Sequence, residues 1–315
     1  MYRYILKRLL LMIPVLFGIS VIVFFIMELI PGDPAQAILG SFATPENVAR
    51  LRSELGLDEP IFTRYFIWLG NILQGDFGRS YSLDRPVLDE VLERLGPTML
   101  LAGTSLLIAS IMGMFAGIVA AVKQFGWQDA FFTFIVLIGI STPSFWLGLM
   151  FVLVFSLELG WFPVSGMTGV VGGGGVLEVL HHLVLPAVTL AVVATGVIAR
   201  LTRSTMLEVL RRDFVRFARA KGLPEGTVIL KHTFRNALVN IIPVLGIQAG
   251  FVIGGAVYIE TVFQWPGIGR MLVSAILTRD ILLVQGGVVV VAAIYVLINL
   301  TADIFQYMLD PRIST

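Results

Sequence analysis

The sequence contains no cysteine and only three histidines. Without cysteine the chain can form neither a disulfide nor a thiolate metal site. His181 and His182 are neighbours, and neighbouring side chains on a helix point about 100° apart, so they are not expected to hold one metal ion. We therefore predict no metal site, and we expect this pair at the outer membrane interface of a helix.

Charged residues are also scarce. They make up 14% of the 315 residues, whereas hydrophobic residues make up 57% and the mean hydropathy is +0.90. Soluble domains carry about 25% charged residues. The composition therefore predicts an integral membrane protein, and the net charge of +1 gives no information about partners.

Two catalytic motifs are missing. None of the four lysines stands after glycine and before serine or threonine, as a Walker A motif requires, so no ATP hydrolysis by a P-loop is expected. Ser165-Gly166 and a distant histidine suggest an intramembrane serine protease, but Ser165 falls in a predicted loop and no Gly-x-Ser-x-Gly motif occurs. We therefore predict a non-catalytic chain with no catalytic residue and no cofactor of its own.

Six apolar runs are long enough to be considered as membrane spans. The first is longer than the core of a secretory signal, which is the competing interpretation and is favoured by Ala35-Gln36-Ala37. Residues 159–182 are apolar too, but Pro163 and the glycines at 172–175 predict a loop. The six predicted spans are Leu9–Met27, Gly96–Val122, Ala130–Leu157, Leu183–Ala199, Asn236–Ile259 and Ile281–Ala302, the last continuing to Leu309.

The predicted fold is all-α, with six transmembrane helices. A large polar segment follows the first helix, and a charged loop joins the fourth and fifth. The predicted organisation is residues 1–30 (tail and first span), 31–95 (extracytoplasmic region, with an amphipathic stretch at 65–73) and 96–315 (membrane domain, with the charged loop at 200–235).

The distribution of basic residues predicts the orientation. Segments assigned to the inner side hold fourteen basic residues, whereas the short outer loops hold two, Arg270 and Arg279. Positively charged loops stay in the cytoplasm. Both termini are therefore predicted to be cytoplasmic.

Residues 200–235, which we call the basic segment, contain nine basic and three acidic residues. Apolar residues recur there at steps of three and four, which predicts one helical stripe of Leu207, Leu210, Phe214, Phe217 and Ala218, opposite Arg212, Arg216 and Arg219. Gly222 can end this helix in a left-handed conformation, and Pro224 suits the first turn of a second helix near Glu225. Two alternatives remain: a loop that only sets topology, and a helix lying flat on lipid headgroups.

Two further features bear on transport. Gly246, Gly250 and Gly254 recur every four residues in the fifth span, which favours close helix packing within the chain or, as the alternative, a seam against a second membrane subunit. The acidic residues Glu28, Glu260 and Asp303 are predicted near span ends, where partial hydration tolerates them. A proton- or sodium-coupled carrier needs ionisable groups near the midplane, so a stand-alone carrier or channel is the less favoured interpretation.

Several short stretches resemble the membrane permease subunits of ATP-binding-cassette (ABC) importers of the dipeptide, oligopeptide and nickel group. The resemblance covers the whole chain, and the number and order of the stretches make it specific. They are Ile30-Pro31-Gly32-Asp33-Pro34, Gly56-Leu57-Asp58 with Pro60, Gly75-Asp76-Phe77-Gly78, Thr142-Pro143 with Phe145-Trp146, Phe162-Pro163-Val164-Ser165-Gly166, Ala218-Arg219-Ala220-Lys221-Gly222-Leu223, Glu260-Thr261-Val262-Phe263, Trp265-Pro266-Gly267-Ile268-Gly269-Arg270, Arg279-Asp280 and Asp310-Pro311-Arg312.

The resemblance implies a role for the basic segment. In such type I importer permeases a loop named for the motif Glu-Ala-Ala carries a coupling helix that docks on the ATPase. Gly222 matches the glycine of that loop and Ala218 its second alanine, whereas Arg216 and Phe217 replace the glutamate and the first alanine. His232, Phe234 and Arg235 replace the usual isoleucine, leucine and proline. The residues implied to couple to the ATPase are Phe214, Arg216, Phe217, Ala218, Arg219, Ala220, Lys221, Gly222 and Leu223.

The resemblance also implies partners and a location. These are a homologous second permease, two ATPase subunits that bind ATP and magnesium, an extracytoplasmic substrate-binding protein and the lipid of the inner membrane, with no nucleic acid. Peptides are the expected substrates, and glutathione-like compounds, opines, sugars and nickel complexes remain alternatives.

Overall fold

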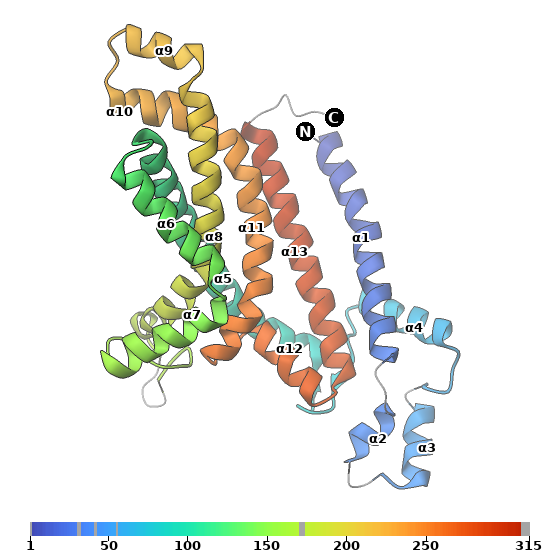
Figure 1. The fold of residues 1–315 in the computed structure, drawn as a ribbon. Coiled ribbons are helices and arrows are strands. Elements are labelled where there is room, and N and C mark those ends of the chain that lie inside the picture. The colour runs from blue at the N-terminus through green and yellow to red at the C-terminus, as the bar shows by residue number, and fades with distance from the viewer. Residues whose placement is uncertain (1, 30–32, 41–42, 55, 170–173, 310–315) are drawn as a thin grey trace. The chain divides into compact units, whose positions relative to one another are not determined.

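The computed structural model describes residues 2–29, 33–40, 43–54, 56–169 and 174–309. Among these residues, five helices are long and apolar enough to cross a membrane, and a sixth span is possible if one bent helix pair counts as a single crossing. Figure 1 shows these helices. They are α1 (Tyr2–Glu28), α5 (Val87–Val122), α8 (Val176–Leu210), α11 (Arg235–Val262) with the short helices before it, and α13 (Ile281–Leu309).

The third predicted span, Ala130–Leu157, is a bent pair of helices rather than one continuous helix. It consists of α6 (Trp127–Ser141) and α7 (Ser144–Phe151), and the latter continues as a π-helical segment from Val152 to Glu158; the two halves meet at 104°. Thr142, which precedes Pro143, has extended backbone angles (φ −91°, ψ 127°). Proline disfavours the helical conformation in the residue before it and donates no backbone hydrogen bond, so the helix ends here.

Two helices are longer than predicted. The fourth, α8, begins at Val176 rather than Leu183 and continues to Leu210, so the predicted loop at 159–182 is shorter than expected. The second, α5, begins at Val87 and runs through Pro97. The predicted loop was extended past Gly175 to His182, which shortened the predicted fourth span. The first turns of α5 hold charged residues, and hydropathy does not detect the polar end of a helix.

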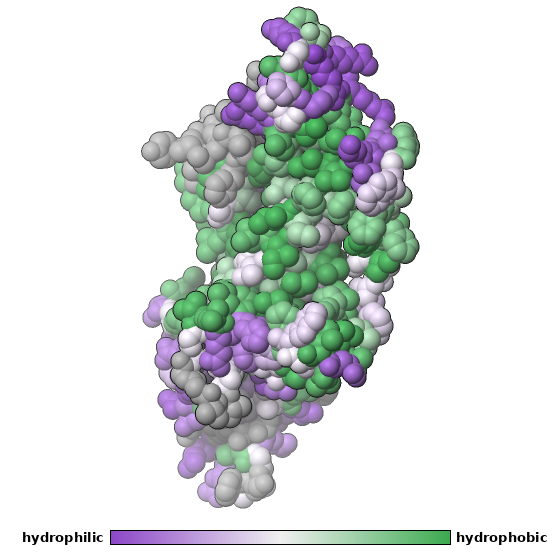
Figure 2. All heavy atoms as spheres, turned by 90° about the vertical axis from the view of Figure 1, so that its left-hand side faces the viewer, coloured by the Kyte–Doolittle hydropathy of each residue, from purple (hydrophilic) through white to green (hydrophobic). Residues whose placement is uncertain are grey.

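The chain forms two compact units. The second unit contains residues 97–266 and 297–315. Here α5 and α6 pack on α8, and the backbones approach closely at glycines: a Cβ atom built on Gly117 would lie 2.5 Å from Thr202 Cβ and 2.6 Å from the Ala199 carbonyl oxygen. Figure 2 shows an apolar surface on this unit below the hydrophilic residues of α9 (Asp213–Ala220) and α10 (Glu225–Thr227).

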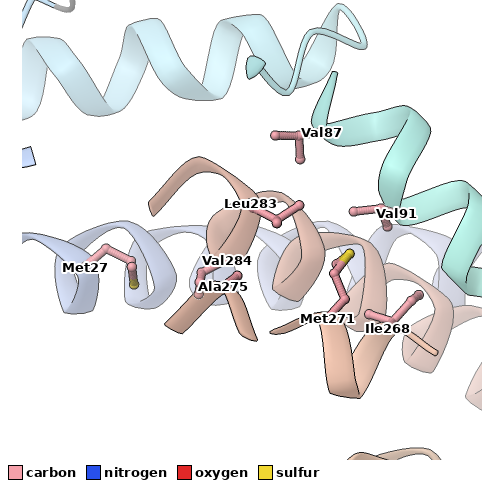
Figure 3. Close-up of a cluster of buried hydrophobic side chains, with 8 residues drawn as sticks. All are labelled: Met27, Val87, Val91, Ile268, Met271, Ala275, Leu283 and Val284. Carbon is pink, nitrogen blue, oxygen red and sulfur yellow. The ribbon is translucent and has the colours of Figure 1, made fainter. Parts of the chain in front are cut away.

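The first unit contains residues 1–96 and 267–296. Besides α1 and parts of α5 and α13, it holds α2 (Pro34–Leu39), α3 (Pro45–Glu54), α4 (Ile61–Leu73), α12 (Ile268–Leu277) and two short antiparallel strands, β1 (Arg79–Ser80) and β2 (Arg85–Pro86). Figure 3 shows its core, in which α1, α5, α12 and α13 bury Met27, Val87, Val91, Ile268, Met271, Ala275, Leu283 and Val284.

Asp280 fixes the hairpin of β1 and β2 within this unit. Its carboxylate accepts hydrogen bonds from the hydroxyls of Ser80 (2.5 Å) and Ser82 (2.7 Å) and from the backbone N–H of Leu283 (3.2 Å). The same side chain therefore caps the N-terminus of α13, where a carboxylate is favoured, and holds the hairpin beside it.

Candidate functional site

The basic segment folds as the end of α8, a turn, α9, a second turn and α10, followed by a π-helical segment from Val228 to Phe234 that leads into α11. At Arg212 the backbone is extended (φ −73°, ψ 148°), which separates α8 from α9. The predicted second helix does begin at Glu225. The predicted first helix, in contrast, is interrupted, because the stripe from Leu207 to Ala218 crosses this break.

The break changes which side of α9 is buried. Val215 and Ala218 are 0% and 7% exposed, and they pack on a cluster that contains Met206, Val209, Val228, Ala237 and Ile241. Phe214 and Phe217, which were predicted to lie on one apolar stripe with Leu207, Leu210 and Ala218, are 41% and 66% exposed. The predicted stripe is therefore divided between a buried pair and two exposed phenylalanines. One pair of small apolar residues anchors α9, and its aromatic residues remain accessible.

The turn after α9 has the predicted glycine geometry. Gly222 has a φ of +79°, its N–H donates to the Arg219 carbonyl (2.9 Å), and the Leu223 N–H donates to the Ala218 carbonyl (3.4 Å). Only glycine adopts this conformation without strain from a Cβ atom. Pro224 then precedes the first residue of α10, and its carbonyl accepts from the N–H of Thr227 (2.9 Å).

Side chains brace this turn. Arg219 Nε donates to Glu225 Oε1 at 2.8 Å, which links α9 to α10, and Lys221 Nζ lies 5.3 Å from the centre of the Phe217 ring. Exposed pairs of this kind contribute about 1 kcal/mol or less each. Their effect is therefore to select one conformation of the turn.

The accessible surface of α9 and its turns is basic and partly aromatic. Arg211, Arg212, Arg216, Arg219, Ala220, Lys221 and Leu223 are all exposed beside Phe214 and Phe217. Figure 2 shows hydrophilic side chains gathered at this end of the unit. Aromatic residues and arginine are the types enriched at protein interfaces, so the surface suits a protein partner that carries acidic and apolar groups.

An ion pair that the sequence did not predict supports the root of this element. Arg203 of α8 donates from Nε to Asp129 Oδ1 and from a terminal nitrogen to Oδ2, each at 2.7 Å. Asp129 also accepts from the backbone N–H of Phe125 (3.0 Å) in the turn between α5 and α6. This bidentate pair ties that turn to α8 about two helical turns before α8 ends at Leu210. The sequence signal for this pair was an acidic residue, Asp129, directly before the apolar run that begins at Ala130.

The pair also lines a cavity of about 650 Å³ between α5, α6 and α8. The cavity is mainly apolar, with side chains such as Phe132, Val136 and Ile140, and its polar lining includes the pair and Arg200.

The three glycines of α11 have different surroundings. A Cβ atom on the buried Gly246 would lie 2.5 Å from Ala302 Cβ, so this glycine packs within the chain. Gly250 is partly buried, and Gly254 is exposed with no atom within 4 Å of its Cβ position. Close approach is more extensive at Gly113 and Gly117 of α5, which show the same four-residue spacing and were not singled out.

Polar residues within the spans are held by the protein. Glu260 was predicted to be partly hydrated, but it is 0% exposed and accepts a hydrogen bond from Thr98 Oγ1 (2.6 Å). Glu28 forms an ion pair with Arg64 (2.6 Å). His181 and His182 contact the backbone carbonyls of Trp161 (2.8 Å) and Gly166 (3.1 Å).

The described residues contain no group of three histidine, cysteine, aspartate or glutamate residues suited to hold a metal ion. Ser165 lies in the irregular stretch between Glu158 and α8. The acidic side chains described above are thus engaged in structural contacts.

Similarity to known proteins agrees with this architecture. The chain is 43% identical over its full length to the whole of the dipeptide transport system permease protein DppB of Alkalihalophilus pseudofirmus, and 41% identical to the glutathione transport system permease protein GsiC of Escherichia coli K12, over 99% of each chain. The fold resembles a chain of the inward-facing MetNI methionine ABC transporter, with a TM-score of 0.58 at 17% identity over 70% of this chain and 95% of that one.

Two family models match the chain. Residues 1–102 match the N-terminal model of binding-protein-dependent transport system membrane components. Residues 113–315 match the model described as binding-protein-dependent transport system inner membrane component. The resemblance predicted from short motifs is therefore confirmed, and the chain belongs to the family of inner-membrane permease components of binding-protein-dependent transport systems.

Proposed function

We propose that this chain forms half of a translocation pathway for di- and oligopeptides, and that it couples ATP hydrolysis by partner subunits to opening and closing of that pathway. The chain itself is non-catalytic in this proposal. ATP and magnesium are bound by the partners, and the coupling residues are those predicted from Phe214 to Leu223.

The coupling role is supported by the way in which α9 is anchored to the membrane helices. Buried Val215 and Ala218 fix the helix to the ends of α8 and α11, while Phe214 and Phe217 remain available to a partner. The left-handed turn at Gly222 and the Arg219–Glu225 pair hold α9 and α10 in one arrangement. A docked ATPase that moves α9 would therefore move the two membrane helices to which it is joined.

The proposed assembly contains a homologous second permease, two ATPases that dock on the basic segments, and an extracytoplasmic substrate-binding protein. Basic residues are concentrated near α9, so we place this side and both termini in the cytoplasm. Residues 31–95 then form the extracytoplasmic region, and residues 96–315 form the membrane domain.

The proposed substrate class follows the relatives that align over nearly all of their length, whose names give dipeptide and glutathione transport. Glutathione is itself a peptide, so short peptides include both. Specificity can reside in the external receptor, because a permease pathway need only let the substrate through.

Gly222→Pro tests the coupling role. Proline requires a φ near −65°, whereas Gly222 has +79° and donates its N–H to Arg219. We expect the variant to insert into the membrane but to lose the ATP hydrolysis that the loaded binding protein stimulates. Gly226→Ala is the matched control, because its Cβ position has no atom within 4 Å and its backbone needs no positive φ.

The measurement is stimulated ATPase activity and peptide uptake by the complete transporter in vesicles, with co-purification of the ATPases measured in parallel. Loss of stimulation in Gly222→Pro with normal activity in Gly226→Ala supports the proposal. Full stimulation in Gly222→Pro would refute the idea that a rigid α9–α10 turn transmits the signal.

A further inference from the structure

The short helix α4 lies against the C-terminal part of the membrane helix α1, as Figure 1 shows. Tyr65 is 3% exposed, its hydroxyl lies 2.9 Å from the hydroxyl of Ser20, and its ring contacts that of Phe24, with 5.4 Å between ring centres. Arg64 binds both carboxylate oxygens of Glu28, at 2.6 and 3.0 Å. These contacts hold α4 beside the last part of α1.

The contacts place α4 at the depth of a membrane boundary. Ser20 and Glu28 are eight residues apart, which is about 12 Å along a helix. Both lie in the apolar stretch of α1, from Arg8 to Glu28, that is long enough to span a bilayer. A helix that touches α1 at both residues therefore overlaps roughly the last two-fifths of the span.

The exposed part of α4 is divided into two faces. With 3.6 residues per turn, Phe62, Phe66 and Leu73 fall within about 40° of one another. They are 65%, 63% and 79% exposed. Thr63, Ile67 and Asn71 are exposed further round the helix, about 80°, 120° and 160° from the centre of this group, and this side is polar except for Ile67. The face formed by Phe62, Phe66 and Leu73 is named the aromatic face below.

The scarcity of charged residues in α4 also favours a position at the membrane boundary. α4 contains no aspartate, glutamate, lysine or histidine, and its single arginine, Arg64, is paired with Glu28. A helix that faces water on its outer side normally carries unpaired charged residues there. Pairing removes the net charge and permits the helix to lie in a region of low dielectric constant.

We propose that α4 is an interfacial helix whose aromatic face is inserted among lipid headgroups and upper acyl chains of the bilayer that α1 crosses. Side chains on other sides of α1 are also exposed at the same level, including Ile22 (57%) and Ile26 (54%), as expected for a helix surrounded by lipid there. Interfacial helices bury their apolar side about 5–10 Å into the headgroup and acyl boundary. The lipid thereby anchors the polar segment that follows α1.

The natural absence of cysteine permits a direct test, because a single introduced cysteine can be labelled alone. Phe66→Cys samples the aromatic face, and Asn71→Cys is the matched control on the polar side of the same helix. Ile13→Cys, at a residue of α1 that is 63% exposed, gives a reference within the span. Each variant carries an environment-sensitive fluorophore in the complete transporter, reconstituted in vesicles of phosphatidylethanolamine and phosphatidylglycerol.

The readout is quenching by aqueous iodide and by lipids with a spin label near the headgroup or deep in the acyl chain. We expect the label at position 66 to be quenched several-fold more by the shallow lipid label than the label at position 71, which iodide should quench more strongly. The label at position 13 should respond most to the deep lipid label. Equal iodide quenching at positions 66 and 71 would overturn the proposal.

Protein coverage is the other outcome that contradicts lipid insertion. In that case the label at position 66 is shielded from both iodide and lipid quenchers in the assembled transporter. Leu73→Cys repeats the measurement at the end of the aromatic face, where the side chain is 79% exposed, so the test does not depend on the folding of one variant. Peptide uptake confirms that each labelled protein is assembled.

Discussion

Replacing Asp129 with asparagine should destabilise the second unit by about 2 kcal/mol. Arg203 makes two hydrogen bonds of 2.7 Å to a carboxylate that is 8% exposed, whereas the Arg203 side chain is 31% exposed. Breaking a fully buried pair costs about 3–5 kcal/mol because one charge is left unpaired. Water that reaches Arg203 reduces this cost, and asparagine can still accept from the Phe125 N–H. A loss of 2 kcal/mol lowers the folding equilibrium constant about 30-fold.

The assay is denaturant unfolding in mixed micelles, followed by tryptophan fluorescence. The set comprises the wild type, Asp129→Asn, Arg203→Met and the double variant. We expect the double variant to be less destabilised than the sum of the two single variants by about 1.5 kcal/mol, because the second change removes a charge that the first left unpaired. Additivity within about 0.5 kcal/mol would refute the argument that the two side chains stabilise each other.

The same variants test the link to function. Because the pair fixes the turn between α5 and α6 to α8, its loss should reduce stimulated ATP hydrolysis even at a temperature where the protein stays folded. The Arg212–Glu208 pair offers a control, since its side chains are 56% and 62% exposed and its loss should change stability by less than about 0.5 kcal/mol. Wild-type coupling in Asp129→Asn would show that α9 needs no such support.

Three further outcomes are expected. Val215→Ala should destabilise the chain by about 2 kcal/mol, since two methyl groups leave a buried site, whereas Phe217→Ala should leave thermal unfolding unchanged and weaken co-purification of the ATPases. Burial raises the pKa of Asp33, but hydrogen bonds from Arg52 and the Ala35 N–H lower it by a larger amount. The pKa of this carboxyl therefore lies below its ordinary value of 3.8. The contribution of this carboxylate to stability is therefore complete above the unfolded pKa and is lost as the pH falls through the folded one; hydrogen exchange of α2 and α3 should rise below about pH 4, and Asp33→Asn should remove that dependence. Gly246→Ala should destabilise the chain, whereas Gly254→Leu should spare its stability and reduce association with a second permease, as measured by cross-linking.

Much of the helical architecture could be predicted because its signals are local. Apolar runs of about 20 residues predict spans wherever they occur. The turn at Gly222 was predicted for the same reason: a glycine followed by Pro224 acts on its own backbone. The bend at Pro143 was equally local, and the unbroken apolar run around it concealed the break.

The side of α9 that is buried could not be predicted from its own periodicity. The prediction treated residues 207–218 as one continuous helix. The backbone break at Arg212 rotates the residues after it relative to those before it, so the two parts do not share one face. Val215 and Ala218 are buried because Met206 and Ile241 lie against them. Ile241 lies more than twenty positions beyond Val215 and Ala218 in the sequence, so a local pattern does not show this contact.

Buried charges show the same limit. The sequence placed Glu260 near a helix end, and only the fold brings Thr98 to within 2.6 Å of its carboxylate. The partnership of Asp129 and Arg203 spans 74 residues and depends on how α6 packs against α8. The partners of each contact lie too far apart in the sequence for a local pattern to show that they meet.

Composition and motif order by themselves determined that this protein crosses a membrane, belongs to a family of transport permeases and carries no P-loop. These properties depend on which residues are present and on their spacing, and both can be read along the chain. The tertiary structure alone decided which glycines pack against a neighbour, which carboxylates are buried and which face of α9 is accessible. Those properties depend on distances between segments remote in sequence, and such distances are fixed only when the helices pack.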